Sequence, residues 1–303
     1  MAEQSRICSS AASQRVHLLA VLVAVASVCL ATATHHPLHC TKWQSNCQKY
    51  DQYCSSEKRA WKSCCEPLTY EFSGESSDGS RLRALSTDIY SVKTGTYSTA
   101  MAWCDMATDG GGWMVILRRA DGEESFERYY DEYEDGFGDL GRDFFYGLRA
   151  LHTITSRDRH ELRIDFYEKA NDTESTSHGY YSSFRLESGD QKYKLHLGNF
   201  IGSDENLLDN LRMFNSRPFI AKDRINNNHP SCVRGNSRGG WWYLEEEDKC
   251  RGDNEPGAVL TVPYRLLFWH DAQAPSLKRT FAKYEVKIRQ KHCLESETSS
   301  SSL

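Results

Sequence analysis

The chain has 303 residues, a formal net charge of −5 at pH 7 and 26% charged side chains. This acidic balance excludes a broadly basic nucleic-acid-binding protein, which would need an excess of cations to neutralise a phosphate backbone. Aromatic residues make up 12% of the chain, which excludes disorder throughout and supplies apolar surface for a large core. The 11 cysteines favour an oxidising compartment.

The first 33 residues have the pattern of a secretory signal peptide. Arg6 and Arg15 precede an apolar run at 16–30, and a small-x-small cleavage site follows at Ala31–Ala33. We therefore predict that residues 1–33 are removed and that the protein is secreted to the extracellular space. The alternative is an uncleaved membrane anchor, because the apolar stretch at 16–33 is just about as long as the roughly 18–20 residues that a spanning helix needs.

A short, polar, cysteine-dense segment follows at 34–64. Its residues Cys40, Cys47 and Cys54 are seven positions apart. On a straight helix such neighbours lie about 10.5 Å apart, too far for a disulfide, so a helical segment would direct them to a partner chain or another segment. The alternative is a looped disulfide knot within one chain. Signal cleavage removes Cys8 and Cys29 and leaves an odd number of cysteines, so at least one thiol is free or bonded to another chain.

The segment at 65–293 is rich in aromatic residues and glycine, and its patterning predicts mixed α and β structure. Strands are expected at 113–117 and 162–166, in the two arms of a hairpin around Gly189 and Asp190, and at 283–289. Short helices are expected at 126–134 and 143–151. Residues 294–303 are predicted to be a disordered tail by composition.

An ordered series of motifs within this segment resembles the fibrinogen C-terminal domain family. The motifs are Trp103–Met106, Gly110–Trp113, Gly136–Leu140, Leu162–Asp165, Gly239–Tyr243 and Lys287–Arg289, and the resemblance covers about residues 65–290. It implies an α+β fold with a mixed antiparallel sheet, short helices and long loops. It also implies a secreted protein similar to ficolins, tachylectins and angiopoietin-like proteins.

The resemblance further implies where a ligand and the disulfides lie. It implies a disulfide between Cys232 and Cys250 that shapes a binding pocket, and a second disulfide from Cys104 to Cys64 or Cys65. The residues predicted to bind ligand are Trp241, Trp242, Lys249, Cys250 and Arg251. The implied function is recognition of an acetylated sugar or a pathogen surface in innate immunity. The alternative is an extracellular adhesion or receptor-binding ligand, for which the tripeptide Arg251-Gly252-Asp253 would suit an integrin.

Two features of the binding region depart from the family pattern. The acidic calcium ligands of the family fall on Ile225 and Asn227, so Asp223 and Asn227 form only a degenerate Ca²⁺ site. We expect weak or absent calcium dependence, with the asparagines at 226–228 forming a turn. An acidic insertion at 245–248 and the loss of two pocket tyrosines also weaken the case for an acetyl-binding pocket.

The remaining motifs concern catalysis, modification and assembly. The chain contains no G-x-S-x-G, H-E-x-x-H or phosphate-binding glycine loop, so we predict a binding protein and not an enzyme. Asn171 begins the one N-glycosylation sequon. We predict a disulfide-linked homo-oligomer, in which chains are joined through the cysteines of the segment Cys40–Cys54 or through Cys293. The individual pairings of Cys47, Cys64 and Cys65 stay open.

Overall fold

The structure, a computed structural model, describes residues 63–65, 86–95, 98–170, 173–205, 207–224, 239–243, 260–261, 267–270 and 278–293. All of them belong to the second of two compact units, Ser45–Leu303. The predicted signal peptide, nearly all of the cysteine-dense segment and the predicted tail lie outside the described residues. In the described part of the chain, no helix has the length and apolar character needed to cross a membrane.

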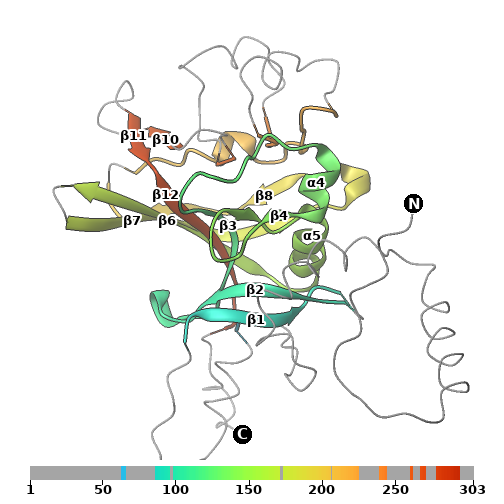
Figure 1. Ribbon diagram of the computed structural model, residues 1–303, viewed down its shortest axis with the longest axis horizontal. Coiled ribbons are helices and arrows are strands. Elements are labelled where there is room, and N and C mark those ends of the chain that lie inside the picture. Colours follow the sequence, from blue (N-terminus) through green and yellow to red (C-terminus); the bar gives the residue numbers. More distant parts are fainter. Residues whose placement is uncertain are drawn as a thin grey trace, which may run out of the picture. The chain divides into compact units, whose positions relative to one another are not determined.

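A ten-stranded sheet dominates the described region (Figure 1). Its main path runs β1–β2–β3–β12–β6–β7–β8, and its pairings are antiparallel. The last strand in the sequence therefore lies in the middle of the sheet, between β3 and β6. The strands of the path are β1 (Asp88–Lys93), β2 (Thr99–Asp105), β3 (Trp113–Arg119), β12 (Lys283–Gln290), β6 (His160–Ala170), β7 (Thr173–Leu186) and β8 (Leu195–Leu197).

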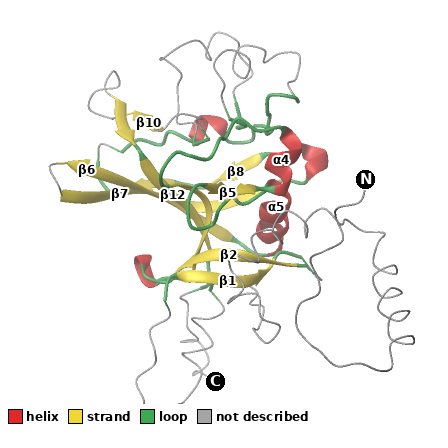
Figure 2. Ribbon diagram, in the orientation of Figure 1, coloured by secondary structure: helices red, strands yellow, loops and turns green. Residues whose placement is uncertain are grey.

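Shorter elements complete the described structure. The sheet also includes β4 (Phe137–Gly138), β5 (Phe144–Phe145) and β9 (Phe200–Gly202), while β10 (Leu267–His270) and β11 (Lys278–Phe281) form a separate pair. The helices α4 (Tyr130–Asp135) and α5 (Leu148–Arg157) lie next to one another, and α5 packs on β7 (Figure 2). Single 3₁₀ turns occur at Thr108–Gly110, Gly189–Gln191 and Arg212–Phe214.

The strand predictions at 113–117, 162–166 and 283–289 fall within β3, β6 and β12, and the predicted hairpin corresponds to β7 and β8. The two helix predictions are partly wrong. Residues 126–129 are not helical, because α4 begins only after Tyr129, whose backbone N–H donates to Glu132 Oε2 at 2.9 Å. Residues 144–145 form β5 instead of a helix, because they pair with β3 and β4.

Two buried disulfides tie the residues at 63–65 to the sheet. Cys64 is bonded to Cys104 on β2, and Cys65 is bonded to Cys293 just after β12, with Cα–Cα distances of 5.4 and 5.5 Å. Of the two partners left open for Cys104, the structure therefore selects Cys64. The prediction that Cys293 joins a neighbouring chain is wrong, because its sulfur is bonded within its own chain.

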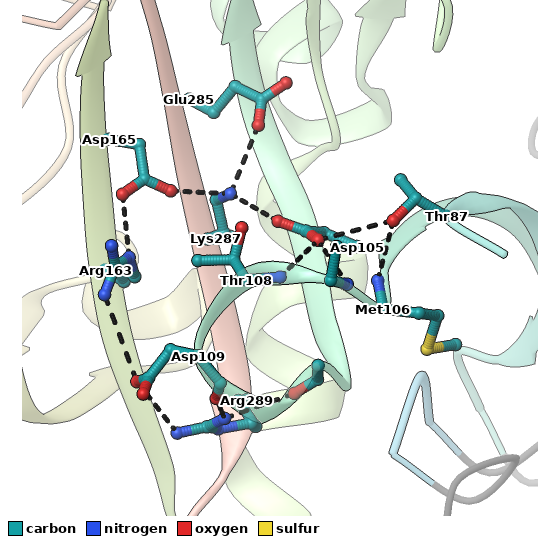
Figure 3. A network of polar contacts seen from close by, with 12 residues as sticks. Thr87, Asp105, Met106, Thr108, Asp109, Arg163, Asp165, Glu285, Lys287 and Arg289 are labelled. Atoms are coloured by element: carbon teal, nitrogen blue, oxygen red, sulfur yellow. Dashed lines mark hydrogen bonds and ion pairs between the residues drawn. The ribbon is translucent and has the colours of Figure 1, made fainter. Parts of the chain in front are cut away.

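The polar centre of the sheet is a buried lysine (Figure 3). The side chain of Lys287 on β12 has no exposed surface, and its Nζ lies 2.7 Å from Asp105 Oδ2, 2.6 Å from Asp165 Oδ2 and 3.3 Å from Glu285 Oε2. These carboxylates come from β2, β6 and β12. A charge this deeply buried is tolerated only when it is paired and hydrogen-bonded, so the lysine and the carboxylates depend on one another.

The pKa values within this network reflect that dependence. Burial by itself raises the pKa of the Asp105 carboxyl, but the ammonium of Lys287 and hydrogen bonds from Lys287 and Thr108 outweigh it, and the pKa falls well below its usual range. Burial by itself lowers the pKa of Lys287, but the charges of Asp165, Glu285 and Asp105 outweigh it, and the pKa rises above its usual range. Asp105 and Lys287 are therefore both charged at neutral pH.

A second cation on the same strand holds a tight turn in place. Nε of Arg289 donates to Glu161 Oε1 at 2.6 Å, and its NH1 donates to the carbonyl oxygens of Asp109 and Gly111 at 2.5 and 3.2 Å. The guanidinium lies 4.1 Å from the centre of the Trp113 ring. The turn requires glycine at position 111, because φ there is 80° and a Cβ would come within 2.5 Å of the Met106 carbonyl oxygen.

We expect Lys287→Met to reduce the free energy of unfolding by about 3–5 kcal/mol, because the substitution leaves buried carboxylates without their counter-charge. Urea denaturation followed by tryptophan fluorescence measures this change. Lys283→Met, an exposed position on the same strand, serves as the control and should change it by less than about 0.5 kcal/mol. A loss below about 1 kcal/mol for Lys287→Met would contradict a central role for the ammonium group.

The stabilities of the wild type and of Lys287→Met should change in opposite directions as the pH falls. In the wild type, the lowered pKa of Asp105 means that its contribution is complete above the ordinary value of 3.8 and is lost as the pH falls below it. Without Lys287, burial raises the carboxyl pKa, so folding is then favoured by protonation. Lys287→Met should therefore gain stability between pH 7 and pH 5, where the contribution of Asp105 in the wild type is constant.

Candidate functional site

A cluster of buried aromatic side chains lies where the predicted ligand-binding residues begin. Phe219 is central to it, with ring centroids 5.9 Å from Tyr130, 5.1 Å from Tyr133 and 5.0 Å from Trp242. Most contacts are edge-to-face or tilted, the geometries that ring quadrupoles favour. We call it the aromatic cluster; its members are Tyr130, Tyr133, Tyr193, Phe214, Phe219, Trp241 and Trp242.

The aromatic cluster anchors the chain on either side of two segments, 225–238 and 244–259, that lie outside the described residues. Ile220 and Trp241 exchange backbone hydrogen bonds of 3.0 Å in both directions. Thr261 Oγ1 donates to the Gly240 carbonyl at 2.6 Å. Gly240 permits this approach, since a Cβ would meet Phe219 at 2.7 Å and Tyr133 at 2.8 Å. The borders of both segments are thus held on one rigid base.

Most of the predicted site residues fall within these two segments. Asn227 and Cys232 belong to 225–238, and Lys249, Cys250 and Arg251 belong to 244–259, so all five lie outside the described residues. The sequon residue Asn171 also lies outside them, between β6 and β7. The fold thus brings together the described borders of the two parts of the chain that carry these predicted residues.

Trp241 and Trp242 are described, and both are buried, with exposed fractions of 3% and 4%. Trp242 Nε1 donates to the Tyr193 carbonyl at 2.7 Å. Trp241 Nε1 is buried without a hydrogen-bond partner, while its ring packs on Phe214. In this structure both indoles pack in the core and hold the base of the two segments. Direct contact with a ligand stays a prediction for both.

Asp223, the first residue of the degenerate calcium motif, is fixed to helix α4. Its Oδ1 accepts the backbone N–H of Tyr130, the first residue of α4, at 2.7 Å. Negative charge is favourable there, because the first N–H groups of a helix have no partner within it. The carboxylate therefore has a structural partner.

Cations on either side of Asp223 strengthen this attachment. Lys222 Nζ donates to the Glu127 carbonyl at 3.0 Å and lies 4.2 Å from the centre of the Tyr129 ring. Arg224 pairs with Asp131 at 2.5 Å, and its guanidinium lies 4.2 Å from the centre of the Tyr130 ring. We call Lys222, Asp223 and Arg224 the 222–224 clamp.

The clamp residues by themselves supply too few ligands for Ca²⁺, and Asn227, the other predicted ligand, lies outside the described residues. Calcium takes six to eight oxygen ligands and gains most of its affinity from carboxylates, whereas the clamp supplies one carboxylate with a cation on each side. Within the described ranges, no group of three or more His, Cys, Asp or Glu side chains is arranged to hold a metal ion.

Tyr130, Lys222 and Arg224 belong to this site although no motif in the sequence marks them. Burial raises the pKa of the Tyr130 hydroxyl to about 12, with the charge of Glu134 adding to the shift, so this tyrosine stays neutral at physiological pH. The only available signal was charge complementarity between Lys222-Asp223-Arg224 and the run Tyr129-Tyr130-Asp131. Nothing in the sequence indicated that these two runs, more than 90 residues apart, would meet.

The matching family model is that of the C-terminal globular domain of fibrinogen beta and gamma chains, over residues 72–289. Ryncolin-4 from Cerberus rynchops is 40% identical over 159 residues, covering 52% of this chain and 43% of the relative. Tenascin-R from Gallus gallus is 39% identical over 141 residues, covering 46% and 10%. The chain thus spans less than half the length of these curated relatives.

Solved structures show the same fold. The fibrinogen-like globe domain of human ANGPTL2 matches with a TM-score of 0.59 at 27% identity, covering 76% of this chain and 99% of that domain. Lamprey fibrin D-dimer, solved with the peptide ligand Gly-His-Arg-Pro-amide, matches with a TM-score of 0.56 at 18% identity, covering 93% and 90%. These matches confirm the predicted α+β fold. Because the family model covers well over half of its residues, the chain belongs to the family of the fibrinogen C-terminal globular domain.

Proposed function

We propose that this protein is a secreted, non-enzymatic recognition protein of innate immunity. Its fibrinogen-related domain binds an acetylated sugar or a pathogen surface through the segments 225–238 and 244–259. The observation that carries the proposal is the convergence of the borders of both segments on the aromatic cluster, through the Ile220–Trp241 pair and the Thr261–Gly240 hydrogen bond. Membership of the fibrinogen-related family supports a binding role.

A second candidate function is adhesion or receptor binding. Arg251-Gly252-Asp253 lies within the segment 244–259, whose described borders are held on the aromatic cluster. The sequence similarity to Tenascin-R and the structural similarity to the ANGPTL2 domain are consistent with this alternative.

A glycan array with the full-length secreted protein distinguishes the two functions. We expect signal on N-acetylated sugars and none on the matching free amines, because an acetyl pocket gains its affinity from the buried methyl group and the hydrogen-bonded carbonyl. Lys249→Ala/Arg251→Ala should reduce binding on the order of tenfold, while the exposed control Lys283→Ala should not. Binding to an integrin ectodomain, with no signal on the array, would instead favour adhesion.

We also propose that recognition does not depend on calcium. The clamp holds residues 222–224 on α4 without a metal, so we expect the same melting temperature in 1 mM CaCl₂ and in chelator. A site with a dissociation constant of about 10 μM would add about 2.7 kcal/mol under these conditions. Asp223→Ala should destabilise the domain by about 1 kcal/mol in both buffers, and Asp223→Asn by less. Calcium stabilisation that disappears in Asp223→Ala would contradict this proposal.

We further propose assembly into a disulfide-linked homo-oligomer through the cysteine-dense segment. The structure accounts for Cys64, Cys65, Cys104 and Cys293 within one chain. If Cys232 pairs with Cys250, the cysteines that remain after signal cleavage are Cys40, Cys47 and Cys54, and three thiols cannot all pair in one chain. Linked copies of a weak site would gain avidity of about 10²–10⁴.

Gel electrophoresis without reductant tests this assembly. We expect dimers or larger species that collapse to monomer with reductant, and monomer alone for the triple variant Cys40→Ser/Cys47→Ser/Cys54→Ser. The matched variant Cys65→Ser/Cys293→Ser removes an intrachain bond and should keep the oligomer. A wild-type protein that migrates as a monomer without reductant would show that the odd thiol is free or capped.

A further inference from the structure

The exposed cations of the described region fall into two groups. In the first group, each guanidinium contacts a carboxylate; its members are Arg142, Arg185, Arg212 and Arg224. In the second group, exposed side chains make no ion pair or hydrogen bond within the described part of the chain; its members at one end of the sheet are Lys93, Arg157, Arg159 and Lys291.

These four cations come from three segments that meet at the end of β12. The backbone N–H of Lys291 donates to the Arg159 carbonyl at 2.9 Å. Arg157 is the last residue of α5, two positions before Arg159. Lys93, the last residue of β1, lines a small cleft that Gln290, the residue before Lys291, also lines. We call the group of Lys93, Arg157, Arg159 and Lys291 the basic end.

The cleft beside the basic end has neutral hydrogen-bonding groups in its wall. Ser63 Oγ donates to Gln290 Oε1 at 2.9 Å, and Gln290 Nε2 donates to Asp158 Oδ2 at 2.8 Å. The His160 ring is buried in the wall, and burial lowers its pKa, so it adds no charge near neutral pH. Asp158 is thus the one carboxylate in the hydrogen bonds described for this wall, whereas the basic end carries four cations.

A helix end accounts for one of these four cations but not for the other three. Arg157 ends α5, and a cation is favourable at a helix C-terminus. Lys93, Arg159 and Lys291 lie on or beside strands and gain nothing from a helix end. The chain as a whole carries a net charge of −5, so overall composition does not produce a local positive surface. Unpaired cations held together by the fold favour an anionic partner.

We propose that the basic end binds a sulfated polysaccharide. Such a chain carries separate sulfate groups that individual Arg and Lys side chains contact, Arg by paired hydrogen bonds. Its hydroxyls suit the side chains of Ser63 and Gln290, which lie among mostly apolar residues in the cleft. A nucleic-acid duplex fits less well, because its continuous charge would also meet the acidic remainder of this protein. The basic end is separate from the segments proposed to bind acetylated sugars, since it lies at the opposite end of β12 from Tyr284, which contacts Leu260.

Heparin affinity chromatography of the full-length protein tests this proposal. We expect retention at about 0.15 M NaCl and elution at higher salt, because screening weakens exposed charge contacts. Arg159→Glu/Lys291→Glu should weaken heparin binding about tenfold or more. The matched control Lys194→Glu/Lys283→Glu changes the net charge equally at two unpaired cations elsewhere, and should weaken binding less than about twofold.

The outcomes separate sulfate recognition from general charge attraction. Unchanged melting temperatures would show that both double variants are folded. Absence of retention, or equal weakening in both double variants, would overturn the proposal. Equal retention on desulfated heparin, or equal binding to a DNA duplex, would overturn the assignment to sulfated glycan. The result is independent of the glycan array, because reversing the charge of Arg159 and Lys291 leaves the segments 225–238 and 244–259 intact.

Discussion

The buried ammonium group of Lys287 connects strands that are far apart in the sequence. Its partner Asp105 lies 182 residues away, yet the two are joined at 2.7 Å in the centre of the sheet. Because β12 lies between β3 and β6, neither half of the sheet is complete until the end of the domain has been added. The Cys65–Cys293 bond lies just after β12 and closes a loop of 228 residues. Closing such a long loop removes a large amount of entropy from the unfolded chain. Charge pairing and covalent closure thus stabilise the same final strand.

Strand β12 also connects the central charge network to both surfaces discussed above. At its start, Tyr284 is buried and donates its hydroxyl proton to the Leu260 carbonyl at 2.7 Å, on the border of the segment 244–259. Past Lys287, Arg289 holds the glycine turn, and Gln290 lines the cleft at the basic end. An eight-residue strand spans about 24 Å, so the two surfaces lie apart while sharing one rigid support.

The sequence was most informative where local pattern and tertiary environment agree. The apolar run in β3 and the alternating residues in β6 and β12 were predicted as strands, because a fully buried strand is apolar throughout and a half-buried strand has one apolar face. The same alternation places Lys287 on the polar face of β12 and would suggest exposure, whereas carboxylates from β2 and β6 bury it. Asp143 and β5 were predicted as part of a helix, but contacts with distant residues hold them in another conformation. The Asp143 carboxylate accepts the N–H groups of Ala120 and Asp121, which lie more than 20 residues away. Pairings at this separation, including that of Cys65 with Cys293, leave no local pattern.

The candidate site shows why a family scaffold tolerates change in its binding segments. The segments 225–238 and 244–259 begin and end on the aromatic cluster, and the described contacts that support this cluster come from α4, β8 and their neighbours. Asp223 is held by α4, so the carboxylates missing at Ile225 and Asn227 are not needed to fix the start of the first segment. The residues that hold the described part of the fold together are therefore Lys287, Arg289 and the aromatic cluster.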